Sequence, residues 1–135
     1  MNNSYSAVAG GNIAPCRFVT MSTSSSEPVV TQSAANDITH GISPKGTRRM
    51  ALSGWDDGYA AIAGVVMMVH GPGDDEALLE LGEAVTAHGA ALQAGTDGKG
   101  ELATTDKDRV GAIAKELGAI GDLIRVRVVR YDAGI

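Results

Sequence analysis

The stretch that decides the fold lies near the end of the chain and reads Gly121-Asp122-Leu123-Ile124-Arg125-Val126-Arg127-Val128. After the Gly-Asp turn, three aliphatic residues alternate with two arginines, so the aliphatic side chains share one face and the guanidinium groups share the other. This period of two predicts a strand. One face packs on a core, and the other meets water or a partner.

The rest of the chain is typical of short strands joined by many turns. Glycine accounts for 18 of 135 residues, well above the average of about 7%, and only 4% of residues are aromatic. β-Branched and aromatic content predicts strands at 17–21 and 28–32, and a third short apolar stretch covers 37–43. The Asp97-Gly98 pair predicts a hairpin turn that leads into a return strand at 101–105.

The same order of elements recurs along the chain. Aligning Ile13 with Val85 places Asp37 opposite Asp108 and Ile42 opposite Ile113, with a one-residue gap in the turn. We therefore expect an all-β fold, a small β-barrel or sandwich built from two similar hairpin units. The length fits one domain, and we expect it to cover residues 13–135 with at most one or two short helices.

Four segments carry weaker signals. Residues 1–12 are mostly Asn, Ser, Gly and Ala, and predict an extended N-terminal arm that is either frayed or ordered by a neighbouring subunit. Residues 60–69 are apolar throughout, and their Val and Met content favours a strand buried on both faces. Residues 74–81 fit a short helix or a strand equally well, and residues 107–118 carry a similar ambiguity.

Charge and hydropathy exclude several classes of protein. The net charge of −5 argues against a nucleic-acid binder, because such proteins neutralise phosphates with a basic face. No apolar run reaches the length of about 18 residues that a membrane span requires, and the first residues lack the pattern of a signal peptide. The single cysteine, Cys16, allows no intramolecular disulfide, so we expect synthesis in a reducing cytoplasm. For the arginines at 125, 127 and 130, an acidic partner surface and plain solvation both fit.

No catalytic or metal-binding pattern emerges, so we expect no enzymatic activity, no cofactor and no metal. The three histidines at 40, 70 and 88 have no metal-ligand spacing, and His88 lies in a predicted turn. Cys16 beside Arg17 is the one candidate nucleophile, and a small buried apolar role is the competing interpretation. Trp55 and Tyr59 flank Asp56-Asp57-Gly58 and fit either an interface anchor or part of the core.

Three blocks of sequence, in order, resemble the small decoration (cement) proteins that coat the heads of tailed bacteriophages. Residues 7–19 resemble the family's run of Gly, a polar residue and apolar–x–Pro–Gly–x–x–Val, with Cys16 where Gly is usual. Residues 36–43 resemble its Asp–x–x–x–Gly–Val/Ile–Ser segment. The closest match is residues 107–128, which look like a Gly-Asp-Arg-Val-x-Gly-Ile-Ala strand followed by Gly-Asp/Glu-Leu-Ile/Val-x-Val, whereas residues 44–75 show no strong parallel.

The resemblance implies a β-barrel-like subunit on the exterior of the virion. It implies a homo-oligomer, commonly a trimer, that binds the major capsid protein and stabilises the capsid by cementing neighbouring subunits, with no nucleic-acid or membrane partner. The residues expected to contact the capsid or a neighbouring copy are Asn2, Asn3, Ser4, Tyr5, Val8, Trp55 and Tyr59. The alternative is a carbohydrate- or host-surface-binding β-module displayed on the virion, in which Trp55 and Tyr59 stack on sugar.

Overall fold

The computed structural model describes residues 4–21, 29–35, 37–44, 59–75, 77–103 and 109–132, and for Tyr131 and Asp132 it describes the backbone alone. These residues confirm the all-β prediction, because their only helical piece is the 3-10 turn η2 (Thr96–Gly98). The strands are β1 (Ser4–Ala9), β2 (Phe18–Met21), β3 (Val29–Gln32), β4 (Gly41–Ile42), β5 (Val66–His70), β6 (Ala77–Glu80), β7 (Ala91–Ala94), β8 (Gly100–Leu102), β9 (Arg109–Ala114) and β10 (Leu123–Asp132).

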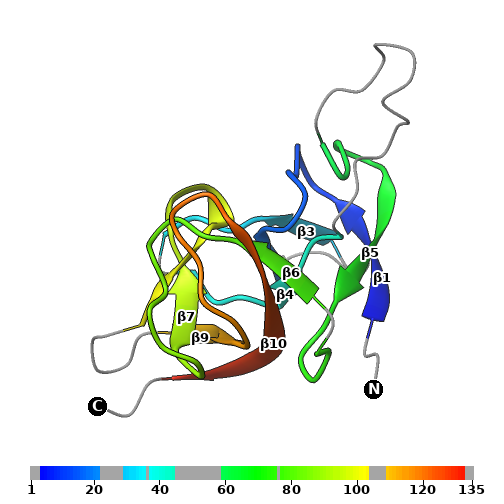
Figure 1. Cartoon of the computed structure of the whole chain (residues 1–135). Helices are drawn as coiled ribbons and strands as arrows, with labels where there is room; N and C mark the ends of the chain where they lie inside the picture. The colour runs from blue at the N-terminus through cyan, green and yellow to red at the C-terminus, as the bar shows by residue number, and fades with distance from the viewer. Residues whose placement is uncertain are drawn as a thin grey trace.

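The strands form two lobes, each made of five strands (Figure 1). In the N-terminal lobe, residues 4–70, the order β1-β3-β2-β4-β5 closes into a barrel in which β1 pairs in parallel with β3 and antiparallel with β5. In the C-terminal lobe, residues 77–132, the order is β6-β10-β9-β7-β8. A single parallel bridge between Leu81 and Gly100 joins the two ends of this second sheet.

The two lobes repeat one another in backbone detail. Ala9 N donates to Val65 O at 2.9 Å in the first lobe, and Leu81 N donates to Asp122 O at 2.9 Å in the second. The turns match as well, since Gly64 N donates to Ala9 O and Gly121 N donates to Leu81 O, both at 2.8 Å.

The register shows the internal repeat read from the sequence, with one difference. Phe18 pairs with Ile42 across β2 and β4, and Ala91 pairs with Ile113 across β7 and β9, so the second lobe has one extra residue between Val85 and Ala91. The two residues aligned at the start of the repeat, Ile13 and Val85, each form an isolated antiparallel bridge. The chain is therefore a tandem repeat of one five-stranded unit.

The predicted N-terminal arm is wrong for the residues that the structure describes. Ser4–Ala9 is a strand with neighbours on both sides, and Ala7 and Ala9 are buried in the core of the first lobe. Small alanine side chains fit the crowded interior of a small barrel, so a sequence of low hydrophobicity still forms a core strand. A chain lacking residues 1–10 loses this strand, and we expect it not to fold.

The apolar segment at 60–69 also differs from its prediction. Only its second half is a strand, and β5 alternates between exposed and buried residues because the barrel has a solvent-facing outer surface. The first half contains a turn at Gly64, where φ is +85°. The two ambiguous segments contain strands, β6 at Ala77–Glu80 and β9 at Arg109–Ala114.

The two lobes share buried apolar residues at their junction. Phe18 and Ile42 come from the first lobe but belong to the core cluster formed by the second, which includes Leu79, Leu92 and Ile124. Backbone bonds cross the junction as well, since Glu80 N donates to Cys16 O at 2.9 Å and Val128 N donates to Asp74 O at 2.8 Å. Residues 71–75 thus connect lobes that pack against each other.

Candidate interaction surfaces

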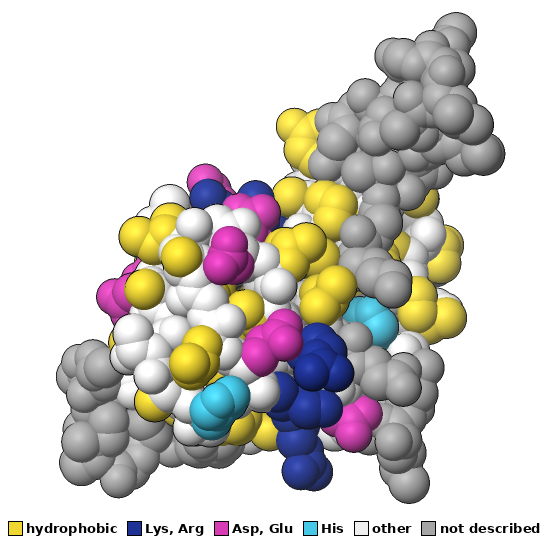
Figure 2. Space-filling view, in the orientation of Figure 1, with side chains coloured by type: hydrophobic (Ala, Val, Ile, Leu, Met, Phe, Trp, Pro, Cys, Tyr) yellow, Lys and Arg dark blue, Asp and Glu magenta, His cyan; other side chains and the backbone are white. Residues whose placement is uncertain are grey.

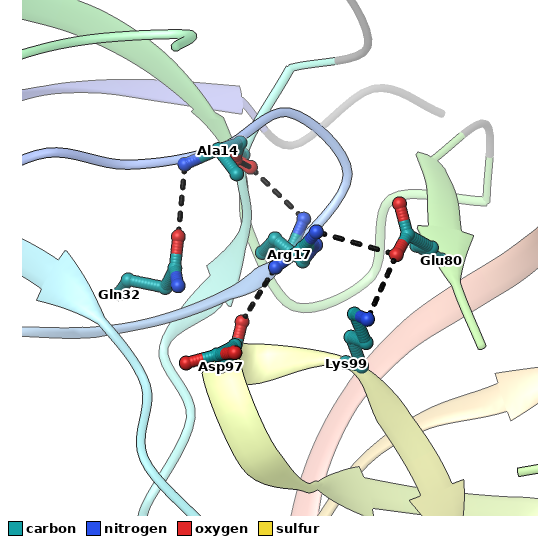
Figure 3. A network of polar contacts seen from close by, with 7 residues as sticks. Ala14, Arg17, Gln32, Glu80, Asp97 and Lys99 are labelled. Atoms are coloured by element: carbon teal, nitrogen blue, oxygen red, sulfur yellow. Dashed lines mark hydrogen bonds and ion pairs between the residues drawn. The ribbon is translucent and has the colours of Figure 1, made fainter. Parts of the chain in front are cut away.

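A polar network at the lobe junction is centred on Arg17 (Figure 3). Its guanidinium lies 3.2 Å from the Glu80 carboxylate and donates to the carbonyl oxygen of Asp97 at 3.0 Å. Lys99 lies 3.4 Å from the same Glu80 oxygen. Arg17, Glu80 and Lys99 each have a partner of opposite charge or a carbonyl oxygen, so the network holds the lobes together, while Arg17 Nε is buried without a hydrogen-bond partner among the described residues.

A face poor in charge covers the outer side of β1 and β5, at the right of Figure 1. Two cross-strand pairs, Val8 with Val66 and Ser6 with Met68, lie on it, and at its edge Ser4 pairs with His70, whose ring lies 2.7 Å from Asp74. Val66 is 65% exposed and Met68 is 52% exposed, although both are large apolar side chains. We call this set, together with Ser4, the apolar face. A group of adjacent exposed apolar side chains is typical of a protein interface.

The C-terminal lobe serves as an internal reference for the apolar face. By the repeat, Leu123 and Arg125 of β10 stand where Val66 and Met68 stand in β5, and their strand partners are Glu80 and Leu78. The same surface of the same fold therefore carries charges in the second lobe. An apolar outer face is not a requirement of this barrel, so the apolar face of the first lobe needs another explanation.

The outer side of β10 carries three exposed arginines, at positions 125, 127 and 130, which we call the arginine stripe. Figure 2 shows dark-blue side chains gathered in one patch over the lower part of β10. Arg125 lies 3.5 Å from Glu116, whereas the described residues supply no ion pair to Arg127 or Arg130.

A small pocket lies where the stripe meets the first lobe. It is lined by Tyr5, Met21, His40, Pro72 and Arg130, which come from both lobes and the segment between them. The Tyr5 hydroxyl donates to the carbonyl oxygen of His40 at 2.8 Å. Loss of hydration, and then the positive charge of Arg130, lower the pKa of His40, so its ring is neutral at neutral pH.

Tyr5 gives the pocket a measurable pH dependence. Burial raises the pKa of Tyr5 to about 12, whereas an unfolded tyrosine titrates near ~10. The folded state therefore holds the phenol proton more tightly, and this contribution to stability is complete below pH ~10 and is lost as pH rises towards ~12. We expect Tyr5→Phe to flatten the alkaline loss of stability in urea unfolding between these two values, relative to the parent chain. An unchanged slope would show that Tyr5 does not titrate in this way.

The structure separates the residues predicted to contact a capsid or neighbour. Ser4 and Val8 lie on the apolar face, as part of a strand, whereas Tyr5 turns inward and packs against the core of the first lobe. Tyr59 is half-buried, and Asn2, Asn3 and Trp55 lie outside the described residues. Val66 and Met68 could not be identified from the sequence, because four consecutive apolar residues at 66–69 hide the alternation that would have revealed them.

Cys16 is buried, with 1% of its surface exposed, and it adopts a positive φ of 59°. Counted back from the equivalent strand residues Phe18 and Ala91, its counterpart is Gly89, whose φ is 79°, so both lobes need a left-handed residue here and Cys16 fills a position suited to glycine. No group of three His, Cys, Asp or Glu side chains suited to a metal occurs among the described residues.

The burial of Cys16 predicts a thiol that reacts only when the protein opens. We expect native protein to resist a disulfide exchange reagent at neutral pH and to react fully in urea. Rapid stoichiometric modification of Cys16 in the folded chain would contradict this prediction and would favour Cys16 as a nucleophile.

Comparison with known proteins bears on the fold. No protein-family model matches this chain, and no curated protein matches it. Among solved structures, the chain is similar to the N base of the head fiber gp8.5 in bacteriophage phi29, with a TM-score of 0.69 and 19% sequence identity, over 98% of each chain. At this identity the similarity establishes a shared fold, and it spans both lobes. In the described residues no helix is long and apolar enough to cross a membrane.

Proposed function

We propose that this chain is a structural protein of a tailed-phage virion that sits on the outside of the head and cements neighbouring major capsid subunits. One observation carries the proposal: the two-lobe fold matches a phage head-fibre base over 98% of both chains. The three decoration-protein-like blocks of sequence point in the same direction. They fall in the β1–β2 region, around β4, and across β9 and β10, so both lobes contribute to the resemblance.

The apolar face supports self-association as part of this proposal. A charge buried between two copies would lose its hydration and would need a partner across the interface, whereas an apolar side chain needs none. Ser4, Ser6, Val8, Val66 and Met68 carry no charge, and burying Val66 and Met68 is favourable. A trimer built on this face would bring three copies to one site on the head, and linked contacts strengthen attachment without new chemistry.

The proposal is tested by sedimenting the purified chain with expanded phage heads that lack it. We expect the chain to travel with the heads at saturable occupancy, and the heads to withstand heat or chelator longer once it is bound, since binding to the assembled state alone stabilises that state. A chain that stays in the supernatant at all concentrations would overturn the proposal.

The role of the apolar face is tested by Val66→Glu/Met68→Glu. Both positions are exposed, so the fold should survive, while the oligomer should dissociate and occupancy on heads should fall by about tenfold or more. Leu123→Glu is the matched control, because Leu123 is 50% exposed and is the counterpart of Val66 in the second lobe. An unchanged oligomeric state in the double variant would show that the apolar face is not the oligomer interface. An equal loss of oligomer and of head occupancy in Leu123→Glu would show the same.

A further inference from the structure

Two arginines on β10 have charges that the described part of the chain does not balance. Arg17 pairs with Glu80 and Arg125 pairs with Glu116, and Arg109 also has a partner. Arg127 and Arg130 have neither an ion pair nor a hydrogen bond to a described residue, in a protein whose net charge is −5. Both guanidinium groups are exposed, so their charges are available to an acidic partner.

The backbone of β10 keeps these two charges on the same side of the sheet. The register against β9 shifts between Val128, which pairs with Ala112, and Tyr131, which pairs with Val110. One extra residue is accommodated in this bulge, and Arg130 remains exposed beyond it. Across this bulge three residues of β10 lie opposite two residues of β9, so Arg127 and Arg130 take positions that correspond to alternate residues of a regular strand.

The pocket next to Arg130 adds an apolar recess and a second donor. Tyr5, Met21 and Pro72 supply its apolar walls. The Nδ1 atom of His40 accepts a hydrogen bond from Met21 N at 3.0 Å, so the neutral ring carries its proton on Nε2. That N–H has no acceptor among the described residues, and with the Arg130 guanidinium it offers two donors to one carboxylate.

We propose that Arg127, Arg130 and the adjacent pocket bind an extended acidic segment of another protein. Carboxylates on alternate residues of the segment bind the arginines, because the planar guanidinium matches a carboxylate in bidentate geometry. An apolar side chain of the same segment enters the recess between Tyr5, Met21 and Pro72. Resting on the proposed function, this segment belongs to the major capsid protein.

An acidic protein segment fits this surface better than nucleic acid does. Nucleic acid is drawn by an extended positive field, and this chain is acidic overall, with only two unbalanced arginines among the described residues. Among the described residues that line the recess, Tyr5 is the one phenol or indole side chain, so the lining offers no series of aromatic rings on which successive bases could stack.

The test uses a short fluorescent peptide with glutamates at alternate positions and one leucine, titrated into the full chain at low salt. Arg127→Gln/Arg130→Gln should weaken binding by about thirtyfold or more, which corresponds to about 2 kcal/mol. Lys115→Gln/Arg125→Gln is the matched control, with the same change in charge at two exposed positions that already have partners in Asp75 O and Glu116. The control should bind within about threefold of the parent chain.

Three outcomes of the peptide titration would overturn the proposal. They are an absence of peptide binding, an equal loss in both double variants, and tighter arginine-dependent binding of single-stranded DNA than of the peptide. The same variants on phage heads separate this proposal from the proposed function. If the parent chain binds heads and Arg127→Gln/Arg130→Gln binds equally well, the docking site is wrong and the virion role stands. If peptide binding depends on the arginines but the parent chain does not bind heads, the virion role is wrong and the docking site stands.

Discussion

Replacing Phe18 with alanine should lower the free energy of unfolding by about 4 kcal/mol, the range measured for large buried aromatic side chains. Phe18 is fully buried and is the largest fully buried side chain among the described residues. It sits on β2 of the first lobe, yet it packs within the core cluster of the second. Its removal leaves a cavity at the junction, so we expect both a loss of stability and a weaker coupling between the lobes. Urea unfolding followed by circular dichroism measures the first effect, and separation of one transition into two measures the second.

The control for this variant is Phe18→Leu, which keeps an apolar side chain at the junction. We expect it to cost about 1–2 kcal/mol and to preserve a single transition. Phe18→Ala unfolding in one transition with a loss below ~1 kcal/mol would contradict the account, because the lobes would then be held together by contacts other than this ring.

Replacing Gly111 with valine should lower the free energy of unfolding nearly as much, because it overfills the junction instead of leaving a cavity there. Gly111 lies on β9 and faces Phe18, and a Cβ added there would overlap Thr39 Oγ1 and lie 2.7 Å from Phe18 Cε1. Thr39 is itself buried and cannot move freely. Overpacking of this kind typically costs about 1–3 kcal/mol, and the added branches of valine place this variant at the upper end. Denaturant midpoints of the two chains measure the cost.

The two junction variants should not be additive. Phe18→Ala opens space where the valine side chain of Gly111→Val must go, so the double variant should be more stable than the sum of the single losses by about 1 kcal/mol or more. Gly11→Val is the neutral control, since a Cβ at Gly11 meets nothing within 4 Å. Strict additivity would show that Phe18 and Gly111 do not contact each other in solution.

Several elements could be predicted because their signal is local. The final strand alternates over Ile124–Val128, and its aliphatic residues are buried while its arginines are exposed. The Asp97-Gly98 turn joins β7 to β8, and both residues have a positive φ. Asp-Gly pairs are common in hairpin turns because these two residues tolerate that conformation. The repeat was also readable, because the turns and strand starts of the two lobes keep nearly constant spacing.

Other elements could not be predicted because they depend on contacts between distant parts of the chain. Ser4–Ala9 reads as an arm, since nothing in six residues with mostly small side chains reveals that β3 and β5 lie on either side. Val66 and Met68 are exposed only because the barrel turns β5 so that Met67 and Val69 face inward. The pocket joins Tyr5 to Arg130, residues near opposite ends of the chain, and no spacing rule links them.

The central claim is that this chain is a structural component of a phage head, and the composition of the particle tests it most directly. Gradient-purified, DNA-filled virions, analysed by quantitative mass spectrometry, should contain the chain in a fixed ratio to the major capsid protein. That ratio should hold across preparations and be lost when residues on the apolar face are made acidic. A chain that is abundant in the lysate and absent from the purified particles would contradict the account.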